Sequence, residues 1–247
     1  MRVTTILQQR RSGRQTSDDS FSERAYQQIR DKILRGEYPL GAALSRRKLA
    51  EELGMSFLPV SEALQRLEMD GVVESKPRVG TRVRVPTKQD IRERYMLREA
   101  LETQAAREFV EHASEQIRLE LLNMGRHLDQ LYACCEGGDS DFLYSVHSYH
   151  MKFHLRIAEA SNCRLLREAI EREQVLVFNW LFDTAAERRT LPTKFHLELA
   201  TALASGDVDI AERNMRAHIR YGLDDVLRAL EPRPDAANWR LRRNDHG

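Results

Sequence analysis

The segment from Ser45 to Leu67 restricts the possible folds most strongly, because it holds two short apolar stripes at helical spacing with one glycine between them. Ser45 and Ser56 are placed to cap the two helices, and Gly54 suits a left-handed residue in the tight turn that joins them. The two stripes consist of Leu49, Ala50 and Leu53, and of Val60, Ala63, Leu64 and Leu67. This pattern predicts a helix-turn-helix unit.

The flanking residues extend this unit into a winged helix-turn-helix domain. Upstream, Ala25, Ile29 and Ile33 recur at helical spacing, and Gly36 supplies the end of that helix. Downstream, two β-prone segments at 72–75 and 81–85 flank a basic turn at 76–80, which predicts a two-stranded hairpin, the wing. We expect this domain to cover residues 21–87.

From residue 88 onward the pattern predicts helices alone. The 247 residues include only 12 glycines and 7 prolines, a composition that excludes an all-β fold and favours a mainly α protein. Breaks near residues 137–139, 161–162, 190–192 and 205–207 divide the stretch 88–231 into six or seven amphipathic helices, typical of an antiparallel bundle. Residues 1–20 predict a flexible polar arm, and residues 232–247 predict a polar tail.

Charge separates the two predicted domains. Residues 1–87 carry 16 lysines and arginines against 11 acidic residues, a net charge of +5, whereas the remainder carries −4. This asymmetry predicts a polyanionic partner for the N-terminal domain alone. The sequence has neither a secretory signal nor an apolar stretch of the roughly 20 residues that span a membrane, so we expect a cytoplasmic protein with no membrane partner. Cys134, Cys135 and Cys163 lack a metal or disulfide spacing and are interpreted as free thiols.

The run from Tyr26 to Val83 resembles the GntR family of bacterial transcriptional regulators in a single register: YQQIRDKILRGEYPLGAALSRRKLAEELGMSFLPVSEALQRLEMDGVVESKPRVGTRV. The resemblance implies that this domain binds double-stranded operator DNA, with the second helix of the pair in the major groove. It assigns to the DNA interface the residues Arg46, Arg47, Ser56, Phe57, Ser61, Arg66, Lys76, Arg78, Gly80 and Thr81.

Two positions depart from the family pattern. Family members usually carry arginines where this chain has Phe57 and Ser61, whereas Arg47 and Gly80 are retained. Because arginine is the common reader of guanine, the departures predict an altered operator or a weaker affinity. Phe57 either contacts a thymine methyl group or is an exposed packing residue. The alternative for the whole domain is a winged helix that contacts only proteins, which the basic residues on the second helix and the wing disfavour.

Four histidines in the second domain could converge. His150 and His154 are four residues apart, so they lie on one helix face as a possible metal clamp. His196 and His218 lie in two later amphipathic segments, and His147 is one turn before His150. Spacing alone leaves open whether these segments meet, because a lone buried histidine is usually an ordinary core residue.

Residues from about 90 to 230 resemble the FCD effector domain of the FadR branch, in the REALE motif ending at Glu102, in HxxFH with ASN after it, and in the two later histidine segments around SGD. The resemblance implies a divalent metal held by an aspartate and three histidines, beside a pocket for a small carboxylate. His154, His196 and His218 match the histidines, and His150 stands where the aspartate is expected.

The exchange of aspartate for His150 changes the expected chemistry. Four neutral imidazoles favour zinc, or nickel, over magnesium or calcium, and they leave the full charge of the metal to attract an anion. The competing interpretation is that metal binding is absent and that the histidines bind an acid directly. Arg98 matches a position that often faces the effector pocket and suits a carboxylate. Its alternative role is an ion pair with Glu102 one turn away.

Together these features predict a homodimeric repressor that responds to a small carboxylate, bound either on the metal or without it, by a change in operator affinity. One alternative is a regulator for which the metal itself is the signal. A metal-dependent hydrolase is a weaker alternative, because the sequence contains no HExxH, GxSxG or GxxxxGK[ST] motif.

Overall fold

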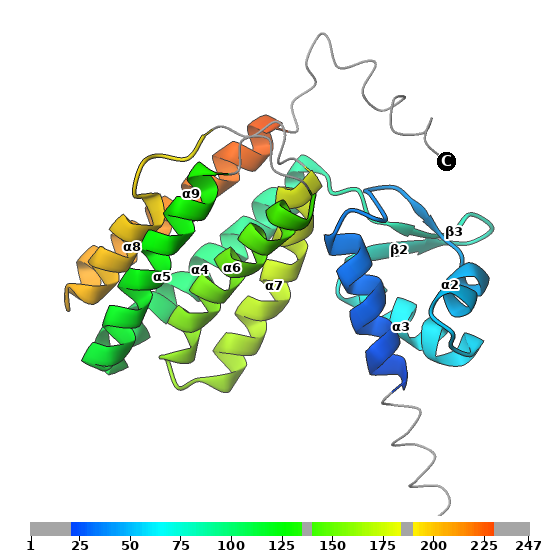
Figure 1. Ribbon diagram of the computed structural model, residues 1–247, viewed down its shortest axis with the longest axis horizontal. Coiled ribbons are helices and arrows are strands. Elements are labelled where there is room, and N and C mark those ends of the chain that lie inside the picture. Colours follow the sequence, from blue (N-terminus) through cyan, green and yellow to red (C-terminus); the bar gives the residue numbers. More distant parts are fainter. Residues whose placement is uncertain (1–20, 135–139, 184–189, 230–247) are drawn as a thin grey trace, which may run out of the picture.

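The computed structural model describes residues 21–134, 140–183 and 190–229, so the predicted arm, the tail and Cys135 lie outside the described residues. A small N-terminal domain and a larger helical bundle lie next to each other (Figure 1). The prediction of a mainly α protein with a winged helix-turn-helix and a helical bundle is confirmed. The N-terminal domain consists of a helix at residues 21–34, β1 (Ala43–Leu44), α2 (Arg46–Glu52), α3 (Phe57–Met69), β2 (Val73–Lys76) and β3 (Gly80–Val83).

The turn between α2 and α3 has the geometry that its sequence predicts. The Ser45 side chain accepts a hydrogen bond from the Lys48 backbone and begins α2. Gly54 has a φ of +60°, and the next amide, that of Met55, donates to the carbonyl of Ala50 over 2.9 Å. This Schellman-type ending stops α2 and turns the chain into α3. The buried faces of the three helices then form one core, which includes Ala25, Ile29, Ile33, Leu49, Val60, Leu64 and Leu67.

The wing contains one more strand than the sequence predicts. The sheet has the order β1-β3-β2, all antiparallel, and β1 pairs Ala43 with Arg82 and Leu44 with Thr81. A two-residue strand carries no alternation that could reveal it, so the prediction of a two-stranded hairpin was incomplete. At the tip of the wing, Arg78 has a φ of 65° and Gly80 a φ of 93°, so the turn uses two left-handed residues.

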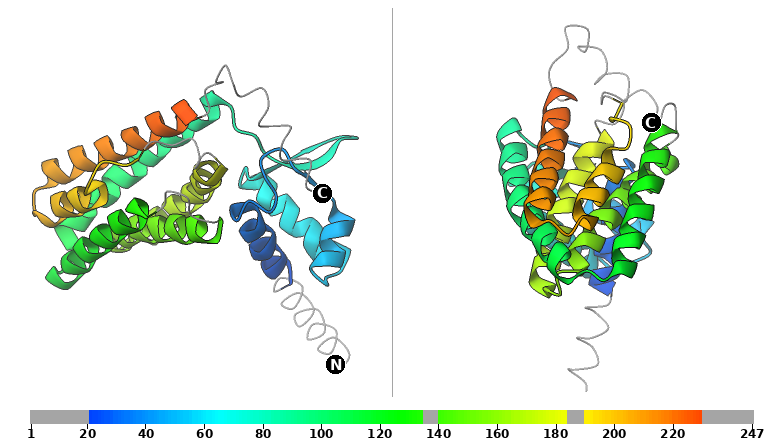
Figure 2. Two further views of the ribbon diagram at one scale, coloured as in Figure 1. Left: turned by 45° about the horizontal axis from the view of Figure 1, so that its top comes forward. Right: turned by 90° about the vertical axis from the view of Figure 1, so that its left-hand side faces the viewer.

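The second domain is a bundle of six helices among the described residues: α4 (Lys88–His112), α5 (Glu115–Ala133), α6 (Ser140–Glu159), α7 (Arg164–Asp183), α8 (Phe195–Ala204) and α9 (Val208–Ala229). The closest pairs are α4 with α9, α5 with α8, and α6 with α7 (Figure 2). The predicted breaks at 161–162 and 205–207 are present, and residues 137–139 lie outside the described residues. The break between α4 and α5 was missed, because Ala113 and Ser114 carry no glycine or proline signal.

Buried apolar side chains fill the interior of the bundle, among them Phe109, Leu121, Leu128, Phe153 and Leu199. The α5–α8 pair packs unusually closely at Gly125, where an added Cβ atom would lie 2.9 Å from the carbonyl oxygen of His196. Only glycine permits this approach, which brings the later turns of α5 next to the start of α8. Within the described residues, no helix is both long and apolar enough to cross a membrane.

Candidate DNA-binding face and histidine centre

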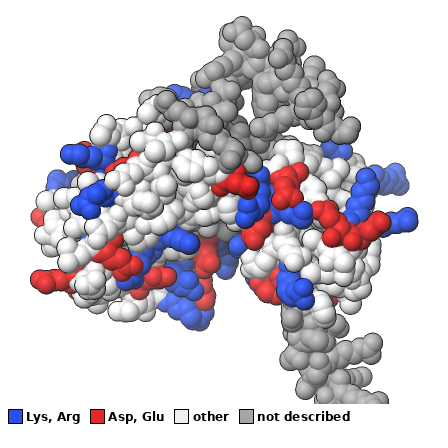
Figure 3. Space-filling view, in the orientation of Figure 1, with Lys and Arg blue, Asp and Glu red and all other residues white. Residues whose placement is uncertain are grey.

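Most of the predicted DNA-contacting residues lie on the surface of the N-terminal domain. Arg46 and Arg47 begin α2 and are exposed, and Arg78 is exposed at the tip of the wing. In the first turn of α3, Phe57 is 59% exposed. Figure 3 shows basic side chains projecting from this domain at its outer edge, together with acidic ones. Among the described residues, no acidic side chain pairs with Arg46, Arg47 or Arg78, so their charges remain available to phosphates.

Two further predicted residues make contacts within the domain. Arg66 forms an ion pair with Glu23, and its guanidinium lies 4.0 Å from the centre of the Tyr26 ring. Thr81 is buried, with its hydroxyl 3.0 Å from that of Ser75. These contacts give the side chains of Arg66 and Thr81 structural roles that the sequence did not predict.

The other predicted residues are intermediate cases. Lys76 lies 3.1 Å from Glu74 but is exposed. Ser61 is partly buried, and Ser56 stands at the N-cap of α3 with no side-chain cap bond. Gly80 is exposed at the wing, and nothing lies within 4 Å of where a Cβ atom would stand.

The four predicted histidines meet in the interior of the bundle. The Nε2 atom of His154 lies 3.0 Å from that of His150 and 3.2 Å from that of His218. One ring nitrogen of His196 lies within 4.8 Å of ring nitrogens of His150 and His218. Two histidines come from α6, one from α8 and one from α9, so three helices bring together residues up to 68 positions apart.

Side chains from two more helices hold the far sides of the imidazole rings. From α4, Glu102 Oε2 lies 2.5 Å from His154 Nδ1. From α5, Asp129 Oδ1 lies 2.8 Å from His196 Nδ1, and the Tyr132 hydroxyl lies 2.8 Å from His150 Nδ1. Each contact fixes a ring through its Nδ1 atom. At His150 and His154, Nε2 is therefore directed to the centre, in the arrangement common around protein-bound metals.

Asp129 also fixes the start of α8. Its two carboxylate oxygens accept hydrogen bonds from the backbone amides of His196 and Leu197, at 2.9 and 3.0 Å. A carboxylate at a helix N-terminus satisfies amides that lack an intrahelical partner. The same side chain therefore positions both the helix and the ring of His196, and the close contact at Gly125 makes this possible.

The electrostatics of the centre keep two of its imidazoles neutral. Burial, followed by the neighbouring histidines, lowers the pKa of His150 and of His218 well below the ordinary value, and Arg98 contributes further at His218. Burial alone would raise the pKa of Glu102, but Arg98 and His154 outweigh it and lower the pKa to about 2. A neutral imidazole is the form of histidine that binds metals, and the lowered pKa favours this form at His150 and His218.

Arg98 forms the ion pair that the sequence offered as its alternative role. Its Nε donates to Glu102 Oε1 over 2.8 Å, and both side chains are buried. The guanidinium also lies over the ring of Tyr95, at 5.0 Å from its centre. Arg98, Glu102 and His154 thus form one chain of contacts that ends at the histidine centre.

His147 lies behind the centre. Its Nδ1 is 3.3 Å from the hydroxyl of Tyr132, on the same oxygen that contacts His150. The ring nitrogens that lie within 4.8 Å of one another belong to His150, His196 and His218, and His154 joins them through its Nε2 contacts with His150 and His218. Asp129 and Tyr132 were missed by sequence reasoning, although they are polar positions beside the buried stripe of Leu121, Gly125 and Leu128 on α5.

Comparison with known proteins agrees with this architecture. Residues 21–83 match the family described as "Bacterial regulatory proteins, gntR family", and residues 93–221 match the FCD domain. The chain is 31% identical over 207 residues to the "Probable D-xylose utilization operon transcriptional repressor" of Paenarthrobacter nicotinovorans, covering 78% of this chain and 84% of that protein.

Two solved structures resemble most of the chain. The "E. coli McbR/YncC" structure has a TM-score of 0.69 and 26% identity, over 84% of this chain and 97% of the other. A putative GntR-type regulator from Rhodococcus sp. RHA1 has a TM-score of 0.68 and 26% identity, over 84% and 98%. The family and the relatives are transcriptional regulators and not enzymes. The chain therefore belongs to the GntR family of DNA-binding transcriptional regulators and carries an FCD domain after its winged helix-turn-helix.

Proposed function

We propose that the protein is a homodimeric transcriptional repressor whose FCD domain holds a divalent metal ion and binds a small organic acid beside it. The observation that carries the proposal is the convergence of His150, His154, His196 and His218, with three of the rings fixed from behind by Glu102, Asp129 and Tyr132. Binding of the acid changes the affinity for the operator. Repression is supported by relatives named as repressors, including the D-xylose operon protein and the "HTH-type transcriptional repressor RspR" of Escherichia coli.

The donor set fits zinc or nickel. Zn–N bonds of about 2.0–2.1 Å in a tetrahedron hold neighbouring nitrogens about 3.3 Å apart. The separations of 3.0 and 3.2 Å around His154 Nε2 are close to this spacing. Without a cation or a shared proton, these nitrogens would face one another with repelling lone pairs. An all-imidazole set also disfavours magnesium and calcium, which prefer oxygen ligands.

An acidic effector is supported by the charge around the centre. Four neutral imidazoles would leave both positive charges of the ion uncompensated within the ligand set. Arg98 adds a buried guanidinium, whose Nε donates to Glu102 Oε1. Its positive charge also acts on His218. A carboxylate beside the metal would therefore meet two sources of positive charge in a medium of low polarity.

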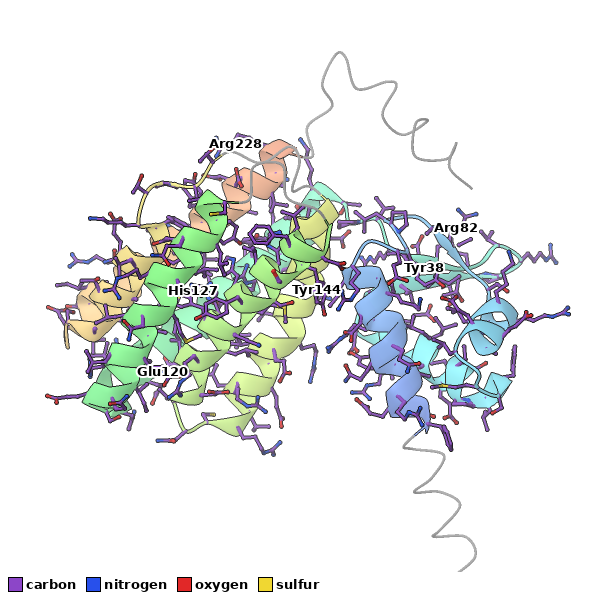
Figure 4. The ribbon with its side chains drawn as sticks, in the orientation of Figure 1. Tyr38, Arg82, Glu120, His127, Tyr144 and Arg228 are labelled. Carbon is purple, nitrogen blue, oxygen red and sulfur yellow. The ribbon has the colours of Figure 1, made fainter. Side chains whose placement is uncertain are left out.

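Helix α6 supplies a route from the metal to the DNA-binding domain. It carries His150 and His154, and near its other end Asp141 lies 3.0 Å from Arg35 Nη1 at the end of the helix at residues 21–34. The Arg35 guanidinium also lies 4.1 Å from the centre of the ring of Tyr144, which Figure 4 labels beside that helix. A shift of α6 on effector binding would move the winged helix and so change the spacing of the two DNA-reading helices.

Dimer formation is proposed on the surface shared by α4 and α9, which lie together at one edge of the bundle (Figure 2). A hollow of about 900 Å³ lies between them. Beside it, Met96 is 73% and Leu97 43% exposed. The hollow is lined by basic residues, Arg92 and Arg216, and by acidic residues, Glu212 and Asp224. Charges of both signs suit a two-fold interface, in which the same surface of each subunit must be complementary to itself. Sedimentation of Met96→Glu tests this surface: we expect monomers, and an unchanged dimer would exclude it.

A regulator that senses the metal itself is the second candidate, and one observation favours it. Four imidazoles fill all four positions of a tetrahedral ion, and closed sites of this kind are typically structural. A six-coordinate ion such as nickel keeps two positions open for an acid. Coordination number therefore separates the two candidates. The visible absorption of the cobalt-loaded protein reports it, because tetrahedral cobalt absorbs much more strongly than octahedral cobalt.

Elemental analysis of the tag-free full-length protein tests the proposal first. We expect close to one equivalent of zinc or nickel in the wild type and in His127→Ala, which alters an exposed histidine on α5 (Figure 4), and much less in His154→Ala. The metal-loaded protein is then titrated with dicarboxylates and sugar acids while binding to operator DNA is measured. A wild type that takes up none of the offered metals would overturn the metal proposal. If the affinity for DNA changes when the metal is added or removed, but does not change with any acid, the result would favour the regulator that senses the metal itself.

A further inference from the structure

Two adjacent apolar side chains stand exposed in the first turn of α3. Phe57 is 59% and Leu58 58% exposed, whereas Val60, Ala63, Leu64 and Leu67 on the opposite face are buried in the domain core. Single exposed apolar residues are common on protein surfaces. An exposed phenylalanine followed directly by an exposed leucine is less ordinary here, because this turn is the part of a helix-turn-helix that meets base edges in the major groove.

The surroundings of this apolar pair are suited to DNA. Arg46 and Arg47 begin α2, which packs against α3, and both are exposed with no acidic partner among the described residues. On the wing, Arg78 is exposed at the tip. The arginines on α2 and on the wing are placed to contact the phosphates at the two edges of a groove. The apolar pair between them is then placed against the bases. A protein partner of ordinary composition would not need this charge.

Apolar side chains recognise a single feature of the major groove. Thymine alone presents a methyl group there, at C5, whereas guanine, adenine and cytosine present hydrogen-bonding atoms. Neither Phe57 nor Leu58 can donate to guanine. Ser56 at the N-cap has a short side chain, and the hydroxyl of Ser61, one turn later, is buried. The guanidinium of Arg66, farther along α3, is occupied by Glu23 and Tyr26.

We propose that Phe57 and Leu58 read thymine methyl groups, so that the operator half-site is specified by thymines at one or two positions rather than by guanines. The proposal rests on the DNA-binding role of α3 and adds the class of base that it selects. Each contact buries a methyl group against an apolar side chain, and the short side chain of Ser56 leaves room for the approach.

Replacement of thymine by deoxyuridine tests this inference, because it removes the C5 methyl group and keeps the base-pairing atoms. The probe is a duplex enriched from random sequences by the full-length protein, with each thymine replaced in turn. For wild type we expect about a fourfold loss of affinity for each contacted methyl group. Phe57→Ala and Leu58→Ala should each bind the thymine and uracil duplexes equally at one position. Met69→Ala is the matched control, because Met69 is 80% exposed at the other end of α3.

A gain-of-function variant provides a second test of the proposal. Phe57→Arg restores a guanine-reading side chain, and we expect its enriched site to gain a guanine where wild type selects thymine. The proposal is overturned if wild type binds all uracil duplexes as well as the parent duplex, or if Phe57→Ala weakens both to the same extent. If the protein enriches no sequence at all, its DNA-binding role fails as well, and the exposed pair is then a surface for a protein partner.

Discussion

The DNA-binding face and the histidine centre place their functional side chains in opposite ways. On the face, Arg46, Arg47 and Phe57 are exposed, and the fold fixes only the backbone that carries them. In the centre, His154 and His196 are buried, and each ring is held by a second side chain from another helix. The face is therefore built for contact with a partner, whereas the centre is built to hold its own geometry.

This difference separates what substitutions do in the two regions. A change on the face removes a contact with DNA and leaves the folded protein almost unaffected, because surface substitutions usually alter stability by less than about 0.5 kcal/mol. A change in the centre removes one member of a buried polar network and leaves the others without compensation. Loss of function on the face and loss of stability in the centre are the two outcomes that the following substitutions test.

The largest effect is expected for Glu102→Ala. The variant leaves the buried guanidinium of Arg98 without its carboxylate and releases His154 Nδ1. Breaking a buried ion pair on one side costs about 3–5 kcal/mol. We expect the free energy of unfolding to fall by about this amount in urea titrations of the chelator-treated protein, where the metal plays no part.

Glu168→Ala is the control for that measurement. It removes the carboxylate of an ion pair with the same spacing along a helix, between Arg164 and Glu168, but with side chains 72% and 40% exposed. Exposed pairs contribute about 0–1 kcal/mol. Similar losses in both variants would contradict the contrast between the buried centre and the surface.

Asp129→Asn addresses the positioning of His196. The amide keeps the size of the side chain and one of the two oxygens that accept from the amides at the start of α8, but it removes the negative charge next to the ring. Loss of such a supporting contact typically lowers metal affinity 10–100-fold. Competition with a chromophoric chelator measures this, and we expect Asn123→Asp, an exposed change on the same helix, to leave the affinity unaltered. Equal metal affinity in Asp129→Asn and wild type would assign Asp129 to the helix start alone.

The same two regions differ in how much of their structure can be predicted from the sequence alone. Periodicity and capping residues predicted the helix-turn-helix, because Ser45, Gly54 and the apolar stripes act within a few residues of one another. The four histidines were predicted through the family resemblance. Their supports were not, because Glu102 and Asp129 meet the histidines only through the packing of α4 and α5 against other helices. Strand β1 was missed for a related reason, since two residues gain strand geometry only by pairing with β3.

On the DNA-binding face, Arg47→Ala should weaken binding without a change in stability. Loss of one phosphate contact reduces counterion release, so the slope of log affinity against log salt should decrease by about one and the affinity should fall about fivefold near 0.15 M salt. Fluorescence anisotropy at several salt concentrations measures both quantities. Arg126→Ala, which removes the same charge from an exposed position on α5, should leave the slope unchanged. An unfolding free energy lowered by more than about 0.5 kcal/mol in Arg47→Ala would show that the face also supports the fold.

Asp90 at the junction between the two domains should show the smallest effect, and one that depends on pH. Its carboxylate accepts hydrogen bonds from the Thr87 amide at 2.8 Å and the Thr87 hydroxyl at 2.7 Å, and it pairs with Arg84 at 2.7 Å. The hydrogen bonds of Thr87, followed by the charge of Arg84, lower the pKa of Asp90 below its ordinary value of 3.8. A lowered pKa means that the ionised form stabilises the fold above the ordinary value, and that this contribution is lost as the pH falls through the lowered one.

Asp90→Asn should therefore cost about 1 kcal/mol at pH 7, as the loss of a helix cap does, and less as the solution is acidified below pH 3.8. Urea unfolding of both proteins at a series of pH values measures the difference. Glu93→Gln, an exposed carboxylate on the next turn of α4, controls for the general effect of charge. A cost that stays constant as the pH falls would assign the stabilisation to the hydrogen-bond geometry of the cap. If the difference in unfolding free energy disappears at low pH, the ionised carboxylate is the source of the stabilisation. The junction between the domains would then depend on a buried or partly buried negative charge, as the histidine centre does.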